Sequence, residues 1–357
     1  MAKLSVIVPV YNVEDCLEWC LDSLRSQTMG DIEIICVNDG ATDGSRDILA
    51  RCAQWDGRIV IIDRENGGLS AARNTGMRAA TSPYVAFLDA DDRFVPQACE
   101  RIVEVMDSTK ADVLTFGAHP YPRDAGTKWL ELVLSPRDVV YDAFEPALLF
   151  EEASRPFSWR TVCSRDFLSR TGVSFDETLA FGEDQAFDFA IYPRSAKTVL
   201  ISDKLYEYRV SRSGSLMDRR RKDPCSMMLE HVDIVRRVFA DWSHLMDDDG
   251  TSLLRKYAAN MLSWVVEFVL YDSLSLDDRS WRLVCAALRP LLDGPLAADG
   301  VAGCSPSERA IIRASLSNAA VGHARRSVLV VRYYLEKRGL KRALEAVRER
   351  LWARRAP

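Results

Sequence analysis

The chain has 357 residues, of which 48% are hydrophobic and 28% are charged, and its net charge is −5. This composition is ordinary for a globular protein with a sizeable core, and the length predicts two domains or one domain with a large appendage. The net charge argues against a protein that binds nucleic acid through its overall charge.

Short apolar runs of strand type alternate with helical patterns over the first half of the chain. The predicted strands are residues 4–8, 32–37, 59–62, 84–88, 113–116 and, further along, 199–202. Apolar residues at helical spacing predict helices between them, at about 17–24, 48–52 and 69–80, and one opened by Pro96. The alternation predicts an α/β fold whose mostly parallel sheet is flanked by helices on both faces.

A polar turn follows each of the first four predicted strands. These turns are Tyr11-Asn12, Asn38-Asp39, Asn66-Gly67-Gly68 and Asp89-Ala90-Asp91. In parallel sheets, ligands bind beyond the carboxyl ends of the strands. We therefore expect the four turns to form a binding site along one edge of the sheet.

The residue types in these turns suit a nucleoside diphosphate with a group attached. Tyr11 can stack on a base, and Asp39 can accept hydrogen bonds from a base edge. Gly67 and Gly68 let the backbone approach a ligand closely, and Arg73 can contact a diphosphate.

Three carboxylates, Asp89, Asp91 and Asp92, come directly after the 84–88 strand. If the chain stays extended there, Asp89 and Asp91 point to one side and Asp92 to the other. Two carboxylates about 4 Å apart repel by about 4 kcal/mol at an effective dielectric constant of about 20, and a divalent cation removes that repulsion. Oxygen ligands favour Mg²⁺ or Mn²⁺, so Asp89 and Asp91 are predicted to hold a ribose and a metal ion; the alternative is a plain acidic turn.

Strand patterns disappear beyond the basic segment Arg219–Pro224. Helices are predicted at 228–242, 253–271, 281–292 and 309–316, with a loop at 292–307 and a helix-ending turn at Asp247–Gly250. The chain is therefore predicted to divide into residues 1–217 and a helical region at 218–357.

The C-terminal tail is basic, with eight basic and two acidic residues from Lys337 to the end. One helical face of the tail is apolar, and its residues are Leu340, Ala343, Leu344, Val347 and Leu351. Two hypotheses stay open: the tail contacts an anionic membrane surface, or it packs on the helical region.

The nine cysteines are scattered without a Cys-x-x-Cys pair, and most lie in apolar runs. They are predicted to be small core residues of a protein in a reducing compartment. No signal peptide and no stretch of about 18 apolar residues is evident, so we expect a cytoplasmic protein.

Several motifs, in order, resemble the family-2 glycosyltransferases of the GT-A fold, in particular their bacterial polysaccharide and lipopolysaccharide branch. The motifs are Pro9-Val10-Tyr11-Asn12 with Glu14, Val37–Asp43, Asn66–Gly68 through Arg73–Gly76, Phe87–Asp92, Gly182-Glu183-Asp184, and Tyr206-x-Tyr208-Arg209 with Ser215. The resemblance spans about residues 3–217 and is specific for fold and reaction type, but not for the sugar.

The resemblance implies an inverting transferase that uses a nucleotide-sugar, usually a UDP-sugar, and acts on a glycan or lipid-linked acceptor. Asp91 would be the direct metal ligand, Asp184 the catalytic base and Glu183 its neighbour in the site. The implied contacts to the nucleotide-sugar are Pro9, Tyr11, Asn12, Glu14, Asp39, Gly67, Gly68, Arg73, Asp89 and Ala90. Asp184 would lie in the first turn of a helix, whose dipole favours its ionised form.

Two positions depart from the family pattern. Trp159-Arg160-Thr161 stands where related sequences commonly have Trp-Asn-Lys, and Asn38 stands where many have a second Asp. Two other functions stay open, a sugar nucleotidyltransferase and a nucleotide-sugar sensor without activity. The first normally needs a glycine-rich basic loop near Pro9–Asn12, which this sequence lacks, and the second needs no base at Asp184.

Overall fold

The computed structural model describes residues 2–353 except 180, 211–222, 271–275 and 318–320; of residues 295, 297, 338 and 340–353 it describes the backbone alone. The chain divides into two compact units, Met1–Ser213 and Gly214–Pro357. The predicted boundary between residues 217 and 218 lies outside the described residues.

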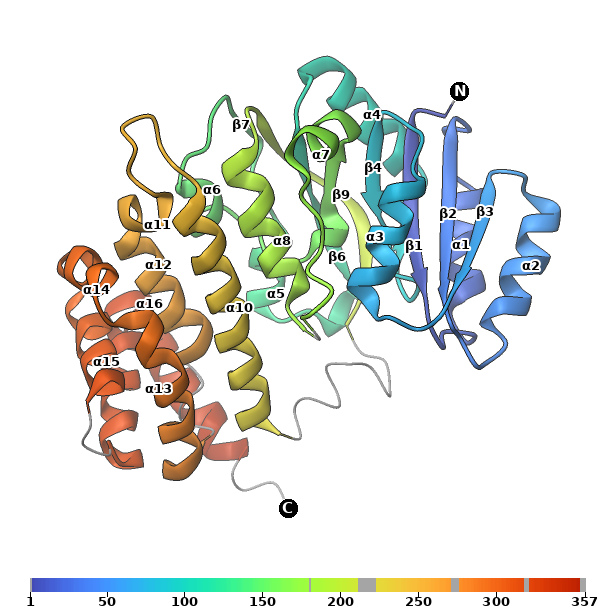
Figure 1. Cartoon of the computed structure of the whole chain (residues 1–357). Helices are drawn as coiled ribbons and strands as arrows, with labels where there is room; N and C mark the ends of the chain where they lie inside the picture. The colour runs from blue at the N-terminus through green and yellow to red at the C-terminus, as the bar shows by residue number, and fades with distance from the viewer. Residues whose placement is uncertain (1, 180, 211–222, 271–275, 318–320, 354–357) are drawn as a thin grey trace. The chain divides into compact units, whose positions relative to one another are not determined.

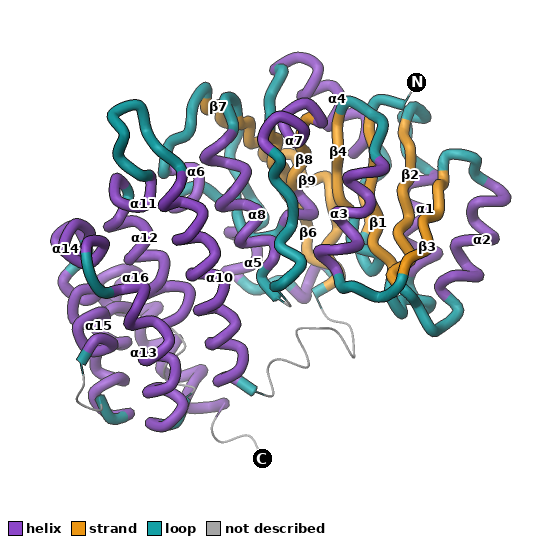
Figure 2. Tube along the Cα trace, viewed as in Figure 1, coloured by secondary structure: helices purple, strands orange, loops and turns teal. Residues whose placement is uncertain are grey.

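The first unit is built on a nine-stranded mixed sheet in the order β3-β2-β1-β4-β8-β6-β9-β5, with β7 paired to β9 (Figures 1 and 2). The strands are β1 (Leu4–Val10), β2 (Ile32–Asp39), β3 (Ile59–Arg64), β4 (Tyr84–Phe87), β5 (Arg93–Phe94), β6 (Val113–Tyr121), β7 (Val139–Tyr141), β8 (Thr161–Ser164) and β9 (Thr198–Arg209). The six predicted strands are confirmed, and β6 and β9 run longer than predicted. The short strands β5, β7 and β8 were not predicted.

The half of the sheet that runs β3-β2-β1-β4 is entirely parallel, as predicted. The register pairs Val10 with Asn38 and Asn38 with Asp63, so the carboxyl ends of these strands meet at one edge. Next to β4, the strand β8 lies between β4 and β6 and pairs antiparallel with both of them.

Helices cover both faces of this sheet (Figure 1). They are α1 (Leu17–Arg25), α2 (Ser45–Trp55), α3 (Leu69–Ala79), α4 (Ala98–Thr109), α5 (Lys128–Val133), α6 (Ala147–Phe150), α7 (Arg165–Thr171) and α8 (Glu183–Ile191), with the 3₁₀ turns η1 (Arg123–Ala125), η2 (Ser158–Arg160) and η3 (Tyr192–Arg194). The chain order reverses between β3 and β4, so right-handed crossovers place α3 on the face opposite α1 and α2.

Gly76 lets α3 pack directly onto the sheet. A Cβ atom at Gly76 would lie 2.4 Å from Cγ2 of Ile7, so a larger residue would push α3 away from β1. This close packing positions Arg73, one turn earlier on the same helix, at the edge of the parallel half.

The second unit is helical, as predicted. Its elements are α10 (Pro224–His244), α11 (Leu253–Lys256), α12 (Ala258–Val265), the π-helical turn η4 (Val266–Leu270), α13 (Asp278–Leu292), α14 (Pro295–Gly300), η6 (Val301–Gly303), α15 (Pro306–Leu316) and α16 (His323–Ala353). The predicted turn at Asp247–Gly250 is confirmed, with the N–H of Gly250 donating to the carbonyl of Asp247. Helix α16 is interrupted at Gly339, where φ is +75°.

The predicted loop at 292–307 is wrong, because α14 and η6 occupy most of it. Its small residues permit close helix packing rather than a loop: a Cβ atom at Gly300 would lie 2.7 Å from Cδ1 of Leu262 on α12. Eight of the nine cysteines are buried, which confirms these eight as core residues, whereas Cys225 is partly exposed; all nine are free thiols. Of the helices in the described part of the chain, none has the length and apolar character needed to span a bilayer.

Candidate active site

The turns after β1 and β2 are tied to each other. Asn12 adopts a left-handed conformation, with φ at +51°, and its Oδ1 accepts the N–H of Thr42 at 2.8 Å. Glu14 accepts the N–H of Gly44 at 2.6 Å. The predicted contacts Asn12 and Glu14 thus shape this edge of the site, whereas the Tyr11 side chain is 48% exposed and available for stacking; Pro9 is buried in β1.

Asp39, at the end of β2, holds the glycine turn that leads into α3. Its two carboxylate oxygens accept the N–H groups of Gly67 at 3.0 Å and Gly68 at 2.8 Å, and Nε of Arg64 lies 3.3 Å away. Gly68 has φ +89°, a conformation that a side chain would strain. A carboxylate has about four acceptor sites, so Asp39 retains capacity for a base edge while it fixes Gly67 and Gly68.

Arg73 joins two distant parts of the sequence, which its sequence context did not predict. Its guanidinium is only 2% exposed, with Nη2 2.7 Å from Oδ1 of Asp89 and Nη1 2.9 Å from Oε1 of Glu183. The ring of Phe175 lies 5.2 Å from its Cζ atom. Both Nη atoms are therefore engaged by carboxylates, and Arg73 brings the Asp89 turn and the start of α8 to one cation.

The segment Asp89–Asp92 is a turn, so the predicted alternation of its side chains is wrong. The strand ends at Phe87, and the N–H of Asp92 donates to the carbonyl of Asp89 at 2.9 Å. The cause lies in Asp92, which is buried and accepts the hydroxyl of Tyr206 at 2.8 Å and the N–H of Arg209 at 2.6 Å. Anchoring Asp92 on β9 turns the chain away from the extended path.

The three carboxylates of this turn consequently differ in environment. Asp89 is paired with Arg73, whereas burial and the neighbouring charges of Asp91 and Asp89 raise the pKa of Asp92, against the hydrogen bonds from Arg209 and Tyr206. The Asp91 side chain is half-buried, and its carbonyl accepts Nε of Arg209 at 2.9 Å. Ala90 between them is buried.

The predicted base, Asp184, lies in the first turn of α8. This helix begins at Glu183, directly after Gly182, whose φ is +66°. Its Oδ2 accepts the N–H of Phe157 at 3.2 Å, and its Oδ1 accepts the N–H of Gln185 at 2.7 Å. Burial, together with the charge of Glu183, raises the pKa of Asp184 to about 6 against these hydrogen bonds and the Arg73 cation. The predicted place of Asp184 in the first turn of a helix agrees with the structure, and burial has the largest influence on its pKa there.

A carboxyl group with a pKa of about 6 is ionised in most molecules at pH 7 and is a stronger base than an ordinary aspartate. Glu183 beside it is held by Arg73. The arrangement thus presents one carboxylate suited to accept a proton and a second fixed in position.

An aromatic stack lines the side of Asp184. The ring of Trp159 lies 4.0 Å from that of Tyr206 and 5.3 Å from that of Tyr208, and Phe157 stacks on Trp159 at 5.1 Å. Sequence reasoning singled out the two tyrosines but missed Phe157, whose backbone contacts the base. The departure at Trp159-Arg160-Thr161 was the only sequence signal in this segment.

The mixed sheet with its parallel half and flanking helices agrees with the GT-A fold that the sequence motifs indicated. Residues 5–165 match the profile of the family described as Glycosyl transferase family 2. Over these residues the first unit is therefore similar to that family.

Two curated relatives agree with this family. EpsJ of Bacillus subtilis (strain 168), an uncharacterized glycosyltransferase, is 35% identical over 208 residues, which are 58% of this chain and 60% of EpsJ. A poly(ribitol-phosphate) beta-glucosyltransferase of Bacillus spizizenii is 31% identical over 60% of this chain and 33% of its own length. The chain thus spans less than two thirds of these relatives.

Solved structures support the fold. TarS residues 1–349 of S. aureus, in complex with UDP, superpose with a TM-score of 0.68 over 94% of this chain and 92% of TarS, at 19% identity. The mannosyltransferase PcManGT of Pyrobaculum calidifontis, in complex with GDP-Man and Mn²⁺, gives a TM-score of 0.51 over 94% of this chain and 88% of its own, at 17% identity.

Proposed function

We propose that this protein is an inverting, metal-dependent glycosyltransferase. It moves a sugar from a nucleotide-sugar, most simply a UDP-sugar, to a glycan or lipid-linked acceptor in cell-surface polysaccharide synthesis. The observation that carries the proposal is the Arg73 bridge, which holds the Asp89 turn and the Glu183–Asp184 helix start at one place. A donor-binding edge and a base from a distant part of the chain are what a transfer reaction needs.

The nucleotide is proposed to bind along the edge of the parallel strands. Tyr11 is exposed for stacking, and Asp39 sits where a base edge would meet it, beside the backbone of Gly67 and Gly68. UDP as the nucleotide is supported by fold similarity to S. aureus TarS, whose crystal structures are described as complexes with UDP and with UDP-GlcNAc.

Asp91 is the proposed metal ligand. The Asp91 side chain is half-buried in the same turn as Asp89, and it is less enclosed than that of Asp92. Among the described residues there is no cluster of three acidic, histidine or cysteine ligands. The carboxylates of this turn fit Mg²⁺ or Mn²⁺, because these ions are commonly held by one or two carboxylates together with substrate phosphates and water. When bound, such an ion would supply charge stabilisation to the diphosphate leaving group.

Asp184 is the proposed general base. It would take the proton of the acceptor hydroxyl while that oxygen forms a bond to the anomeric carbon and the bond from this carbon to the diphosphate breaks. One displacement inverts the anomeric centre, and the diphosphate leaves without needing a proton from a carboxylic acid. One base therefore suffices, unlike the carboxyl pair of glycoside hydrolysis. Glu183, held by Arg73, would orient the site.

The two other functions are less well supported. A sugar nucleotidyltransferase does not agree with the family-2 profile over residues 5–165. A sensor without activity would not need a base whose pKa is raised to about 6 beside the donor edge.

Peripheral membrane contact at the cytoplasmic face is the proposed way to reach a lipid-linked acceptor. Within α16, Val328 and Leu335 are 67% and 40% exposed, and the exposed Arg325 and Arg332 lie on the same stretch. These four residues precede the basic tail in the sequence, and the side chains of the tail from Leu340 onward lie outside the described residues. Exposed apolar side chains flanked by arginines suit an anionic bilayer surface.

A donor screen tests the proposed function. UDP-, GDP- and dTDP-sugars are incubated with the full chain and Mn²⁺, and free nucleotide is measured. We expect release of UDP from at least one UDP-sugar and its loss with excess EDTA. Release of no nucleotide from any donor, together with no donor-induced rise in melting temperature, would contradict the proposal.

A further inference from the structure

A buried arginine lies one peptide group away from the proposed base. Arg160, in η2, is 0% exposed; its Nε donates to the carbonyl of Pro156 at 3.0 Å and its Nη1 to the carbonyl of Val133 at 2.5 Å. Its Nη2 makes no hydrogen bond to any described residue. A guanidinium enclosed in this way needs a compensating charge nearby.

Asp188 lies on α8, one helical turn after Asp184, and no ion pair joins it to Arg160 in the contacts described. It is 0% exposed, and neither of its oxygens accepts a hydrogen bond from the described part of the chain. Burial and the charge of Asp184 raise the pKa of Asp188, whereas Arg160 and Arg155 favour its ionised form. Conversely, burial lowers the pKa of Arg160 to about 10, against the attraction of Tyr192, Asp188 and Asp184.

Arg160 is connected to the base through one peptide group. The carbonyl that accepts Nε of Arg160 belongs to Pro156, and the N–H of the same Pro156–Phe157 peptide donates to Oδ2 of Asp184 at 3.2 Å. The two groups lie on opposite sides of a planar peptide unit, so a hydrogen bond at the carbonyl fixes and polarises the N–H.

The peptide is held in an unusual conformation. Phe157 has φ +85°, which is costly for a residue with a side chain, and its ring lies 5.1 Å from Trp159 and 5.4 Å from Tyr208. A strained backbone persists only where its surroundings enforce it. Here the aromatic stack holds the side chain and Arg160 holds the carbonyl.

We propose that Arg160 is a positioning residue for the general base. By holding the carbonyl of Pro156, Arg160 aims the N–H of Phe157 at Asp184. The inference rests on the proposed function of Asp184, and Arg160 does not touch the donor edge in the contacts described.

The charged groups around Asp184 determine whether a substitution raises or lowers its pKa. Glu183 and Asp188 share its helix, Arg73 comes from α3, Arg160 from η2 and Tyr208 from β9, while Arg155 faces Asp188. Removing the Arg160 cation disfavours ionised Asp184, so its pKa rises. Asp188→Asn keeps the hydrogen bond from Arg160 to the carbonyl of Pro156, so it should move the pKa of Asp184 less.

The test compares Arg160→Met, Arg160→Lys and Asp188→Asn with the wild type. Single-turnover transfer is measured from pH 5 to 9 at saturating donor, and donor affinity is measured in parallel. We expect Arg160→Met to lose roughly 10-fold or more in rate with donor affinity unchanged. The midpoint of its rising limb should move up by roughly 1 pH unit, whereas Asp188→Asn, which leaves the peptide hydrogen bonds in place, should move the midpoint less. Arg160→Lys keeps the charge and should shift the limb least.

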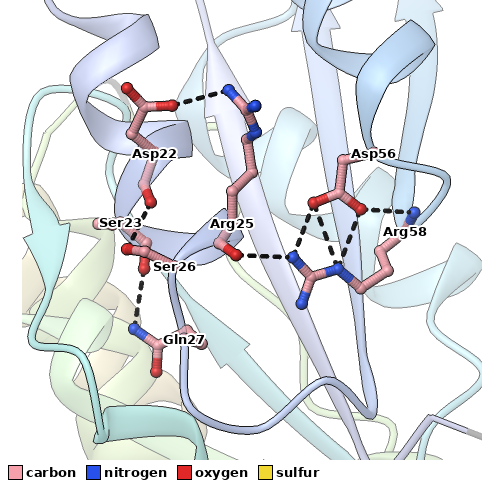
Figure 3. Close-up of polar contacts among 7 residues, drawn as sticks. All are labelled: Asp22, Ser23, Arg25, Ser26, Gln27, Asp56 and Arg58. Atoms are coloured by element: carbon pink, nitrogen blue, oxygen red, sulfur yellow. Dashed lines mark hydrogen bonds and ion pairs between the residues drawn. The ribbon is translucent and has the colours of Figure 1, made fainter.

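Arg58→Met is the matched control. Arg58 also makes side-chain hydrogen bonds, to Asp56 and to the carbonyl of Arg25, on a surface of the first unit formed by α1, α2 and the start of β3 (Figure 3). Its loss should lower the melting temperature and leave the pH profile in place. An unchanged midpoint in Arg160→Met, or an equal shift in Asp188→Asn or in the Arg58→Met control, would overturn the inference.

A second measurement decides the inference independently of turnover. The ¹³C carboxyl signal of Asp184, assigned by its absence in Asp184→Asn, is titrated in the wild type and in the variants. An upward shift of its midpoint in Arg160→Met, without an equal shift in Asp188→Asn, supports the positioning role even if no donor is turned over. If the wild type transfers sugar but these midpoints do not move, the inference fails and the proposed function stands.

Discussion

Replacing Asp184 by Asn should stabilise the protein at neutral pH, although it removes the proposed base. The pKa of Asp184 rises from 3.8 to about 6 on folding, mainly through burial and the charge of Glu183. For an acid with a raised pKa in the folded state, stability is fully present below the unfolded pKa and is lost as the pH rises through the folded pKa.

The magnitude follows from the size of this shift. Roughly 2 pH units at about 1.4 kcal/mol each give an upper bound of about 3 kcal/mol at pH 7. Asn accepts through one oxygen, so one of the two N–H groups now bound by Asp184 loses its partner, at a cost of about 1 kcal/mol. The net gain is about 2 kcal/mol, or roughly 4–8 °C in melting temperature for a unit of this size.

The assay is urea unfolding of both proteins between pH 4 and 8. The advantage of Asp184→Asn should grow from about pH 4 to about pH 6 and level off above pH 7. Glu33→Gln is the control of opposite sign. Burial raises the pKa of Glu33, but hydrogen bonds from Ser5, Thr81 and Ser82 outweigh burial and lower the pKa. Glu33→Gln should therefore become less stable than the wild type as the pH rises. A pH-independent difference for Asp184→Asn would refute the reasoning.

Three further predictions concern the nucleotide, the metal and the tail. UDP with Mn²⁺ should raise the melting temperature, and Asp39→Ala should remove most of that rise; equal stabilisation by ADP or GDP would count against base reading by Asp39. Asp91→Asn should abolish turnover and metal-dependent nucleotide binding while circular dichroism stays unchanged, and wild-type activity that survives excess EDTA would exclude the metal role. Removal of the residues after Gly339 should abolish salt-sensitive binding to anionic vesicles, and equal binding to neutral vesicles would contradict it.

The sequence predicted the parallel half of the sheet because its signals are local. The β-branched runs of β1 to β4 and the polar turns after them are contiguous, and parallel pairing brings those turns to one edge. The short strands β5, β7 and β8 escaped prediction because pairing with distant strands, rather than their own composition, makes them strands.

The site was harder to predict where contacts join distant residues. Arg73 and Glu183 are 110 positions apart, so nothing local indicated that Arg73 would pair with carboxylates. Asp92 and Tyr206 are 114 apart, and their hydrogen bond converts the expected extended segment into a turn. Asp188 did have a local signal, because it follows Asp184 at helical spacing, but its burial beside Arg160 depends on the tertiary fold.

Single-turnover transfer with parallel donor titration, for the wild type, Asp184→Asn and Glu183→Gln, tests the central claim most directly. Asp184→Asn should lower transfer about 10²–10⁴-fold while donor affinity stays nearly unchanged, since general-base catalysis contributes about that factor. Glu183→Gln should cost less, because Glu183 is held by Arg73 and does not take the proton. Normal transfer by Asp184→Asn, or a larger loss in Glu183→Gln, would contradict the account and make Glu183 the candidate base.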